Sequence, residues 1–271
     1  MALVTIKKNR PVVNKVDSFC ELIRGYDVSK INFTELFNDF DASIKKDHKV
    51  TDSALSNVHG DWYEYLISIN FNNYAIANDI EFIALPLPNI TSFYIYDLYI
   101  NKLQNYVRDL KKTLQESANV SLITSNPDFV VIRKSVFNKH LRILKYNKKD
   151  IDYINALYQD AVGKCKLDDI KCFFGVKNTV RPDRRLQFAH EGSLIKAIYA
   201  HMQTRDWLIN PIGIKYYALA TSFNDADSIA LKTVATHSIV TVHDTPRCAV
   251  DGIFAVNNEK ACQKAASSIL N

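Results

Sequence analysis

The 271-residue sequence predicts an α/β fold in which a mixed central β-sheet is flanked by helices. Short runs rich in apolar and β-branched residues alternate with longer segments of helical periodicity. Hydrophobic side chains make up 47% of the chain, which is enough for one sizeable core. Glycine and proline number only seven each, and no linker or internal repeat interrupts the chain.

One domain is therefore expected over residues 1–271, in three parts. Residues 1–75 are predicted to be helical, because Trp62, Leu66 and Ile69 recur at helical spacing in their last segment. Residues 76–245 are expected to hold the sheet and the long helix that carries the candidate functional residues. Residues 246–271 are expected to form C-terminal helices.

The elements after residue 75 follow from the spacing of apolar residues and from the position of proline. The predicted strands are 81–88, the two runs on either side of 126–128, 171–180, 212–222 and 236–242. The predicted helices are 102–116, 150–162, 184–205, one near 245–255 and 258–270.

Composition narrows the class of protein. No apolar run approaches the roughly 20 residues that span a bilayer, so a cytosolic protein without membrane contact is expected. The five cysteines form an odd set without a C-x-x-C pair, which argues against disulfides and structural zinc and predicts reduced, mostly buried thiols. The net charge of +5 favours an anionic partner but is also ordinary for a soluble enzyme.

An aspartate and a lysine stand where the local pattern favours buried strands. Asp128 follows Pro127 and precedes an apolar run, and Lys177 follows "CFFGV". Each has a simple structural explanation by itself, since Asn-Pro-Asp is a common turn and a lysine can extend its charge to solvent from a sheet edge. Together they match the layout of PD-(D/E)xK nucleases, whose carboxylates hold magnesium and whose lysine orients the attacking water or helps to deprotonate it.

The layout normally places an acid two residues before the lysine, but that position is Gly175. Glu191 is the candidate replacement, because it shares a helical stripe with Ile195, Ile198 and Met202 and would point inward. A buried carboxylate needs a cation or a metal nearby, although a salt bridge to a neighbouring basic residue would also satisfy it.

Glu64 is a further candidate, an acid among aromatic and aliphatic residues on a predicted helix. A further carboxylate benefits metal-dependent phosphodiester cleavage as a ligand or a water-positioning group.

The stretch "RPDRR" carries side chains that read G·C pairs in the major groove. Arg181 and Arg184 can each donate two hydrogen bonds to guanine, and Asp183 can accept one from the cytosine amino group. Seven residues separate Arg184 from Glu191, so base-reading groups and a metal ligand would lie on one helix about 10 Å apart. The arginines could equally position phosphates or form a solvated charge cluster.

At these residues the chain resembles the type IIF restriction endonucleases that cut at sites with a CCGG core, in particular members whose sites add a purine before and a pyrimidine after it (RCCGGY). The resemblance is carried by "GDWYE" (60–64), "LITSNPDF" (122–129), "VKNTVRPDRRLQFAHEGSLIKAIYAH" (176–201), "INPIGIKYYALATS" (209–222) and "LKTVATHSI" (231–239). It covers most of the chain from about residue 55 onward and leaves the first 50 residues without a counterpart.

The resemblance implies a PD-(D/E)xK restriction-endonuclease-like fold and Mg²⁺-dependent cleavage of double-stranded DNA in the cytosol of a prokaryote. The implied active-site set is Asp128, Lys177, Glu191 and Glu64, with Asp128 and Glu191 as metal ligands. The implied base-reading set is Arg181, Asp183 and Arg184. The family's acid is displaced from the strand to the helix, which fits Gly175. Its members are homotetramers, and Trp207 and Arg205 fall at the contact between dimers.

Two other functions share part of this pattern. A DNA-binding regulator could use the arginine cluster without cutting, and metal-dependent strand scission would exclude it. A repair or recombination nuclease of the same fold would act on DNA structure and would cut unrelated sequences similarly.

Overall fold

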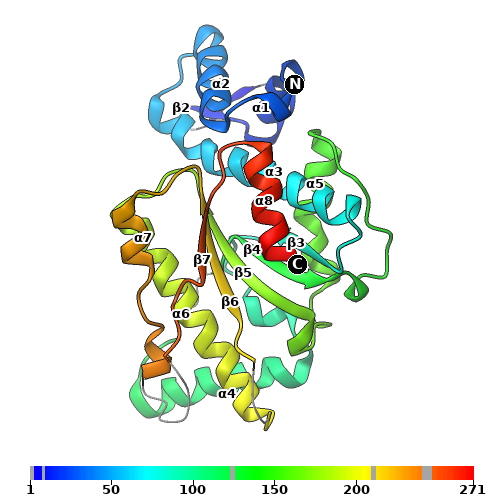
Figure 1. The fold of residues 1–271 in the computed structure, drawn as a ribbon. Helices are drawn as coiled ribbons and strands as arrows, with labels where there is room; N and C mark the ends of the chain where they lie inside the picture. The colour runs from blue at the N-terminus through cyan, green and yellow to red at the C-terminus, as the bar shows by residue number, and fades with distance from the viewer. Residues whose placement is uncertain (1–2, 8–9, 123–125, 209–211, 240–245) are drawn as a thin grey trace.

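The computed structural model describes residues 3–7, 10–122, 126–208, 212–239 and 246–271. Its centre is a five-stranded mixed sheet with the strand order β3-β4-β5-β6-β7 (Figure 1). The strands are β3 (Phe82–Pro86), β4 (Phe129–Arg133), β5 (Ile170–Lys177), β6 (Lys215–Ala220) and β7 (Gly252–Ala255). Pairing is antiparallel from β3 to β5 and parallel from β5 to β7, so the predicted mixed sheet is confirmed.

Eight α-helices are present in the described part of the chain. They are α1 (Lys15–Leu22), α2 (Phe33–Asp47), α3 (Asp52–Ala77), α4 (Asn101–Ala118), α5 (Lys148–Ala156), α6 (Pro182–Arg205), α7 (Asp225–Leu231) and α8 (Glu259–Leu270). The helices predicted at 102–116, 150–162, 184–205 and 258–270 correspond to α4, α5, α6 and α8. The helical segment predicted before residue 75 corresponds to α3.

Local sequence explains where the two helices nearest the site begin. The Thr51 side chain accepts a hydrogen bond from the amide of Ala54 at 3.3 Å and caps α3. Pro182 occupies the first turn of α6, where its missing N–H costs no helical hydrogen bond. Helix α6 therefore begins two residues earlier than predicted, and β5 ends at Lys177, three residues earlier than predicted.

Helices α3 and α6 cover opposite faces of the sheet. Phe71 of α3 packs on Phe174 of β5 with ring centroids 5.4 Å apart, whereas Phe188 of α6 packs beside Gly175. Neighbouring side chains on a strand point to opposite faces. The end of β5 consequently lies between one helix from each layer.

Two expectations about the ends of the chain are wrong. Residues 4–7 and 10–13 form an antiparallel pair, β1 (Val4–Lys7) and β2 (Arg10–Val13), where helix was expected. The helix predicted near 245–255 is a strand in its second half, β7. Strand β7 belongs to the sheet because it pairs in parallel with β6, and just before this ladder the amide of Tyr216 donates to Oδ2 of Asp251 at 2.7 Å.

Two predicted strands are absent from the described residues. Residues 236–239 form a 3₁₀-helix, and 240–242 lie outside the described part of the chain. Residues 120–122, at the start of the run before Asn126, are not in a strand, and 123–125 also lie outside it. Both segments are apolar but short, and a short apolar run does not determine its own conformation.

The composition also predicts that no helix spans a membrane and that the cysteines are reduced and mostly buried. None of the helices in the described ranges is sufficiently long and apolar to cross a membrane. All five cysteines are free thiols, and four are buried, as expected, while Cys248 is exposed.

Candidate active site

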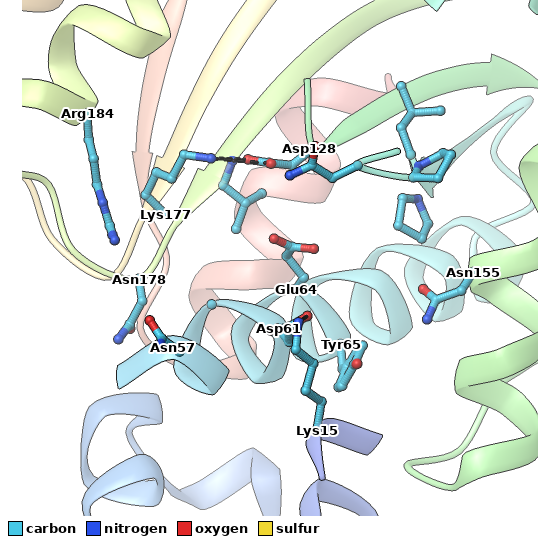
Figure 2. A pocket seen from close by; sticks show the side chains of 16 residues that line it. Lys15, Asn57, Asp61, Glu64, Tyr65, Asp128, Asn155, Lys177, Asn178 and Arg184 are labelled. Atoms are coloured by element: carbon cyan, nitrogen blue, oxygen red, sulfur yellow. Dashed lines mark hydrogen bonds and ion pairs between the residues drawn. The ribbon is translucent and has the colours of Figure 1, made fainter. Parts of the chain in front are cut away.

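Asp128 and Lys177 meet at the edge of the sheet between α3 and α6. Because β4 and β5 are antiparallel, the start of β4 adjoins the end of β5, and Asp128 directly precedes β4. The Lys177 ammonium lies 2.9 Å from Oδ2 of Asp128, and the amide of Val176 donates to the same oxygen at 2.6 Å (Figure 2). The two charged side chains are only 16% and 20% exposed. The predicted pairing of a strand aspartate with a lysine from the neighbouring strand is thus a direct ion pair.

The pKa of Lys177 is set by opposing effects. Burial lowers it, but the carboxylates of Asp128, Glu191 and Glu64 outweigh burial and leave the pKa above its usual value. The side chain is therefore a cation at neutral pH. A protonated lysine can donate hydrogen bonds and stabilise negative charge, but it cannot accept a proton.

Glu191 points inward from α6, as its helical stripe predicts. It is 2% exposed, and the stripe residues Ile195, Ile198 and Met202 are buried with it. Gln187 Nε2 donates to one carboxylate oxygen at 2.9 Å and Tyr216 Oη donates to the other at 2.7 Å. Both oxygens are thus held by neutral donors.

Burial and the nearby Asp128 raise the pKa of Glu191, while Tyr216, Lys177 and Gln187 oppose the rise. A cation bound beside this carboxylate would favour its ionised form. No direct ion pair joins Glu191 to a lysine or arginine among the described residues, so the salt-bridge explanation of its burial is not supported.

Gly175 cannot carry the acid that the PD-(D/E)xK layout usually places there. A Cβ atom at this position would lie 2.5 Å from Tyr216 Oη and 2.7 Å from Phe188 Cε1. The space of the usual carboxylate is filled by these two rings. One of them, Tyr216, instead holds the carboxylate that comes from the helix.

Glu64 approaches the ion pair from α3, on the other side. Its carboxylate points toward Asp128 (Figure 2). Burial raises the pKa of Glu64 to about 8, and the negative charges of Asp128 and Asp61 add to the rise. Within the described ranges no side chain donates a hydrogen bond to this carboxylate. Glu64 is therefore largely protonated at neutral pH until a cation binds nearby.

Two cavities meet at the ion pair, and Asp128 and Lys177 line both. The first has a volume of about 690 Å³ and also contains Glu64 and Arg184. The second has a volume of about 520 Å³ and also contains Glu191. The four predicted catalytic residues are therefore brought together around one point.

The donor set fits a hard divalent cation. Asp128 and Glu191 offer carboxylate oxygens to one cavity, and oxygen is the ligand that Mg²⁺ prefers. No group of three or more His, Cys, Asp or Glu side chains with metal-binding geometry exists among the described residues. A site with two carboxylates leaves positions for water and phosphate, which Mg²⁺ commonly retains.

The predicted base-reading residues lie at the start of α6. Arg181 and Asp183 are exposed and 3.5 Å apart, so both are accessible to a ligand. Arg184 is partly buried, donates to the Thr179 carbonyl at 2.9 Å and lines the first cavity beside Lys177 (Figure 2). Asp183 and Arg184 thus share α6 with Glu191, and Arg184 shares the first cavity with Asp128, Lys177 and Glu64.

Trp207 and Arg205 lie at the opposite end of α6. Trp207 is 89% exposed and adopts a φ of 55°, a left-handed conformation that is uncommon for a bulky side chain. Arg205 lies 3.5 Å from Asp109 of α4 and covers the ring of Tyr106. The arginine is held by its own chain, whereas the indole faces outward.

Sequence reasoning missed Gln187 and Tyr216. Gln187 precedes Glu191 by four residues, a spacing that places both on one helix face, so this contact could have been predicted. Tyr216 comes from β6 and gives no local signal. Its hydroxyl reaches Glu191 only because β5 and β6 pair in parallel beneath α6.

The sequence and the fold of this chain are similar to those of known proteins. Residues 6–271 match the model of the Cfr10I/Bse634I restriction endonuclease family, so most of the first 50 residues, for which no counterpart was expected, are matched too. The type II restriction enzyme Cfr10I of Citrobacter freundii is 40% identical to this chain over 275 residues, which cover 97% of this chain and 96% of that enzyme.

Solved structures show the same likeness. The Bse634I restriction endonuclease superimposes with a TM-score of 0.88 at 31% identity over 99% of this chain and 96% of its own. The type IIF endonuclease Bse634I with cognate DNA superimposes with a TM-score of 0.87 at 31% identity over 99% and 97%. The chain belongs to the Cfr10I/Bse634I family of restriction endonucleases and is a homologue of type II restriction enzymes.

Proposed function

We propose that this protein cleaves both strands of DNA with Mg²⁺ at a palindromic site with a CCGG core, in the form RCCGGY, in the cytosol of a prokaryote, and that residues 1–271 act as one endonuclease domain. The supporting observation is the cluster of Asp128, Lys177 and Glu191 beside the start of α6. The likeness to Cfr10I and to Bse634I, the latter solved with cognate DNA, supports the same activity.

Asp128 and Glu191 would hold the magnesium ion. When bound, Mg²⁺ supplies charge that stabilises the developing phosphorane and favours deprotonation of water. Asp128 is fixed by the Val176 amide and by Lys177, and Glu191 by Gln187 and Tyr216. Both carboxylates are thus oriented before substrate binds, which reduces the reorganisation needed at the transition state.

Lys177 would orient the attacking water and stabilise negative charge on the phosphate. Its raised pKa excludes it as the base while it pairs with Asp128. Glu64 would position water from the α3 side. A cation bound at Asp128 and Glu191 would favour the ionised form of Glu64, whose carboxylate could then accept a hydrogen bond from the water.

Arg181, Asp183 and Arg184 would read the CCGG core. Arginine pairs bidentately with guanine, and aspartate accepts from the cytosine amino group. Exposure of Arg181 and Asp183 supports this role. Because the same helix carries Glu191, binding of the correct bases would also place the metal ligand.

A homotetramer, built as a dimer of dimers, is the proposed assembly, with Trp207 and Arg205 at the contact between dimers. An indole that is 89% exposed beside a cavity of about 700 Å³ is suited to such a contact. Light scattering should give a tetramer for the native protein and a dimer for Trp207→Ala.

The decisive test is digestion of a long DNA of known sequence with purified protein and Mg²⁺, followed by sequencing of every end. Ends that share RCCGGY support the proposal, and other flanking bases would correct it outside the core. Ends without a common sequence would indicate a structure-specific nuclease.

Asp128→Ala separates cleavage from folding. It should abolish scission while a gel shift with specific DNA survives, because Asp128 contributes chemistry more than base reading. Intact DNA with a gel shift for the native protein itself would favour a regulator that only binds DNA.

A further inference from the structure

A lysine outside the catalytic set lies in the second cavity. Lys111 of α4 lines it together with Asp128, Lys177 and Glu191. Its ammonium lies 4.0 Å from the ring centroid of Tyr94 and 4.7 Å from that of Tyr96.

The two tyrosine rings hold the lysine in place. Tyr94 and Tyr96 stack with centroids 5.2 Å apart, and the Tyr96 hydroxyl accepts a hydrogen bond from Lys111 at 2.9 Å. Little side-chain entropy remains to be lost when a ligand binds a cation fixed in this way.

The charge of Lys111 is not neutralised within the described residues, where no ion pair includes it. Asp97 lies nearby, but one of its carboxylate oxygens already accepts the amide of Tyr94 at 2.8 Å. Burial lowers the pKa of Lys111, and Tyr94 and Asp97 offset only part of the effect. Its neighbour Lys112, in contrast, is exposed and pairs with Glu116.

A partly buried ammonium without an acidic partner is suited to an anion. The side chains around the same cavity add hydroxyl and amide groups, from Thr91, Ser121 and Asn89. The anion nearest to the proposed cleavage site is the DNA backbone itself.

We propose that Lys111 and its tyrosine cradle form a phosphodiester subsite that binds a backbone phosphate next to the one that is cut. The inference rests on the proposed nuclease function. The contact would hold the strand against Asp128, Lys177 and Glu191. It would contribute to affinity and register and not to sequence choice, because every nucleotide carries the same phosphate.

The test is the salt dependence of DNA binding, measured by fluorescence anisotropy without Mg²⁺ on a duplex with the cognate site. The association constant falls as salt rises, and loss of one phosphate contact reduces the magnitude of the negative slope of log K against log salt by about 0.9. A palindromic site engages two protomers, so Lys111→Gln should make the slope shallower by about 1.8 and weaken binding about fivefold per protomer at physiological salt.

Lys112→Gln is the matched control, since it removes an equal charge from the next residue of the same helix. It should change the slope by much less than Lys111→Gln. Lys111→Arg retains the charge and the aromatic contacts, so its slope of log K against log salt should stay close to that of the native protein. Circular dichroism and thermal melts verify that each variant is folded.

Equal slopes for Lys111→Gln, Lys112→Gln and the native protein would overturn the subsite, even if the native protein cuts RCCGGY as proposed. A changed ratio of cognate to non-cognate affinity in Lys111→Gln would also overturn it, because a phosphate contact affects both alike. Failure of the native protein to cut any DNA would instead refute the proposed function.

Discussion

The ion pair of Asp128 and Lys177 has a carboxylate on each side, and the two differ in their surroundings. Glu191, from α6, has both oxygens held by neutral donors. Glu64, from α3, has no hydrogen-bond donor among the described side chains, and the nearby Asp61 and Asp128 repel its charge.

The comparison teaches that burial alone does not define the role of an acid. Burial raises the pKa of both carboxylates, but only Glu191 is held in a fixed geometry. A metal ligand must keep its position, whereas a group that moves a proton must be able to change its charge near neutral pH. We therefore expect Glu191 to act as the ligand and Glu64 as the water-positioning group.

The largest expected effect is on the cleavage rate, when Glu191 and Glu64 are each replaced by the isosteric glutamine. Glu191→Gln should lower the cleavage rate by more than about 100-fold, because it removes a charged metal ligand. Glu64→Gln should lower it by about 10-fold to 100-fold, the usual effect of losing a group that orients a ligand or a water without itself holding the metal. Single-turnover cleavage of a one-site duplex measures both, and equal losses would remove the distinction between the two sides.

Tyr216→Phe tests whether its hydrogen bond makes Glu191 differ from Glu64, since it removes one of the two donors that fix Glu191. A loss of about 10-fold to 100-fold in metal affinity is expected, from the usual effect of a group that orients a ligand. Calorimetric titration of the DNA-bound protein with Ca²⁺ measures it without cleavage. Tyr217→Phe is the control, because Tyr217 points to the opposite face and packs on Phe254. A similar effect of both variants would mean that Tyr216 has a packing role only.

Gly175→Ala tests why the acid lies on the helix. Its Cβ would meet Tyr216 and Phe188, so a loss of about 1 to 3 kcal/mol in the free energy of unfolding is expected. Gly60→Ala in α3 provides the contrast. Its Cβ would meet no atom within 4 Å, and helix propensity predicts a gain of about 0.5 to 1 kcal/mol. Denaturant titration measures both, and a neutral Gly175→Ala would show that the strand position has room for a side chain.

The pH dependence of stability tests the unfavourable surroundings of Glu64. The folded pKa of Glu64, about 8, exceeds that of an ordinary glutamate, so its protonated form stabilises the fold below the ordinary pKa, and this contribution is lost as pH rises toward 8. Glu64→Gln should therefore gain stability relative to the native protein as the pH rises. Thermal melts in EDTA from about pH 5 to 9 measure the difference. A constant difference over this range would contradict the raised pKa.

The sequence pattern alone predicts those helices and strands in which apolar residues recur at one regular spacing. The apolar strand β3, the amphipathic α4 and the long α6 were all predicted, because each repeats one signal over several residues. The short strands β1, β2 and β7 were missed, since four residues carry too little periodicity and the pairing that stabilises them is not local.

At the candidate active site, too, some features follow from the local sequence and others only from the tertiary structure. An acid after proline, a lysine ending an apolar run and a glutamate in an apolar stripe are each unusual locally, and the sequence by itself indicated Asp128, Lys177 and Glu191 as candidates. Only the tertiary structure decided that Asp128 and Lys177 form an ion pair, because that contact depends on the antiparallel register of β4 and β5.

The tertiary structure also supplied the partners that carry no local signal. Tyr216 is one of many tyrosines in the sequence, and it holds Glu191 only because β6 pairs with β5 beneath α6. Lys111 is one of several lysines on α4, and the cavity and its contacts with Tyr94 and Tyr96 distinguish it from Lys112. The side chain determines which chemistry a residue can perform. Its role depends on the distances that folding sets between segments far apart in the chain.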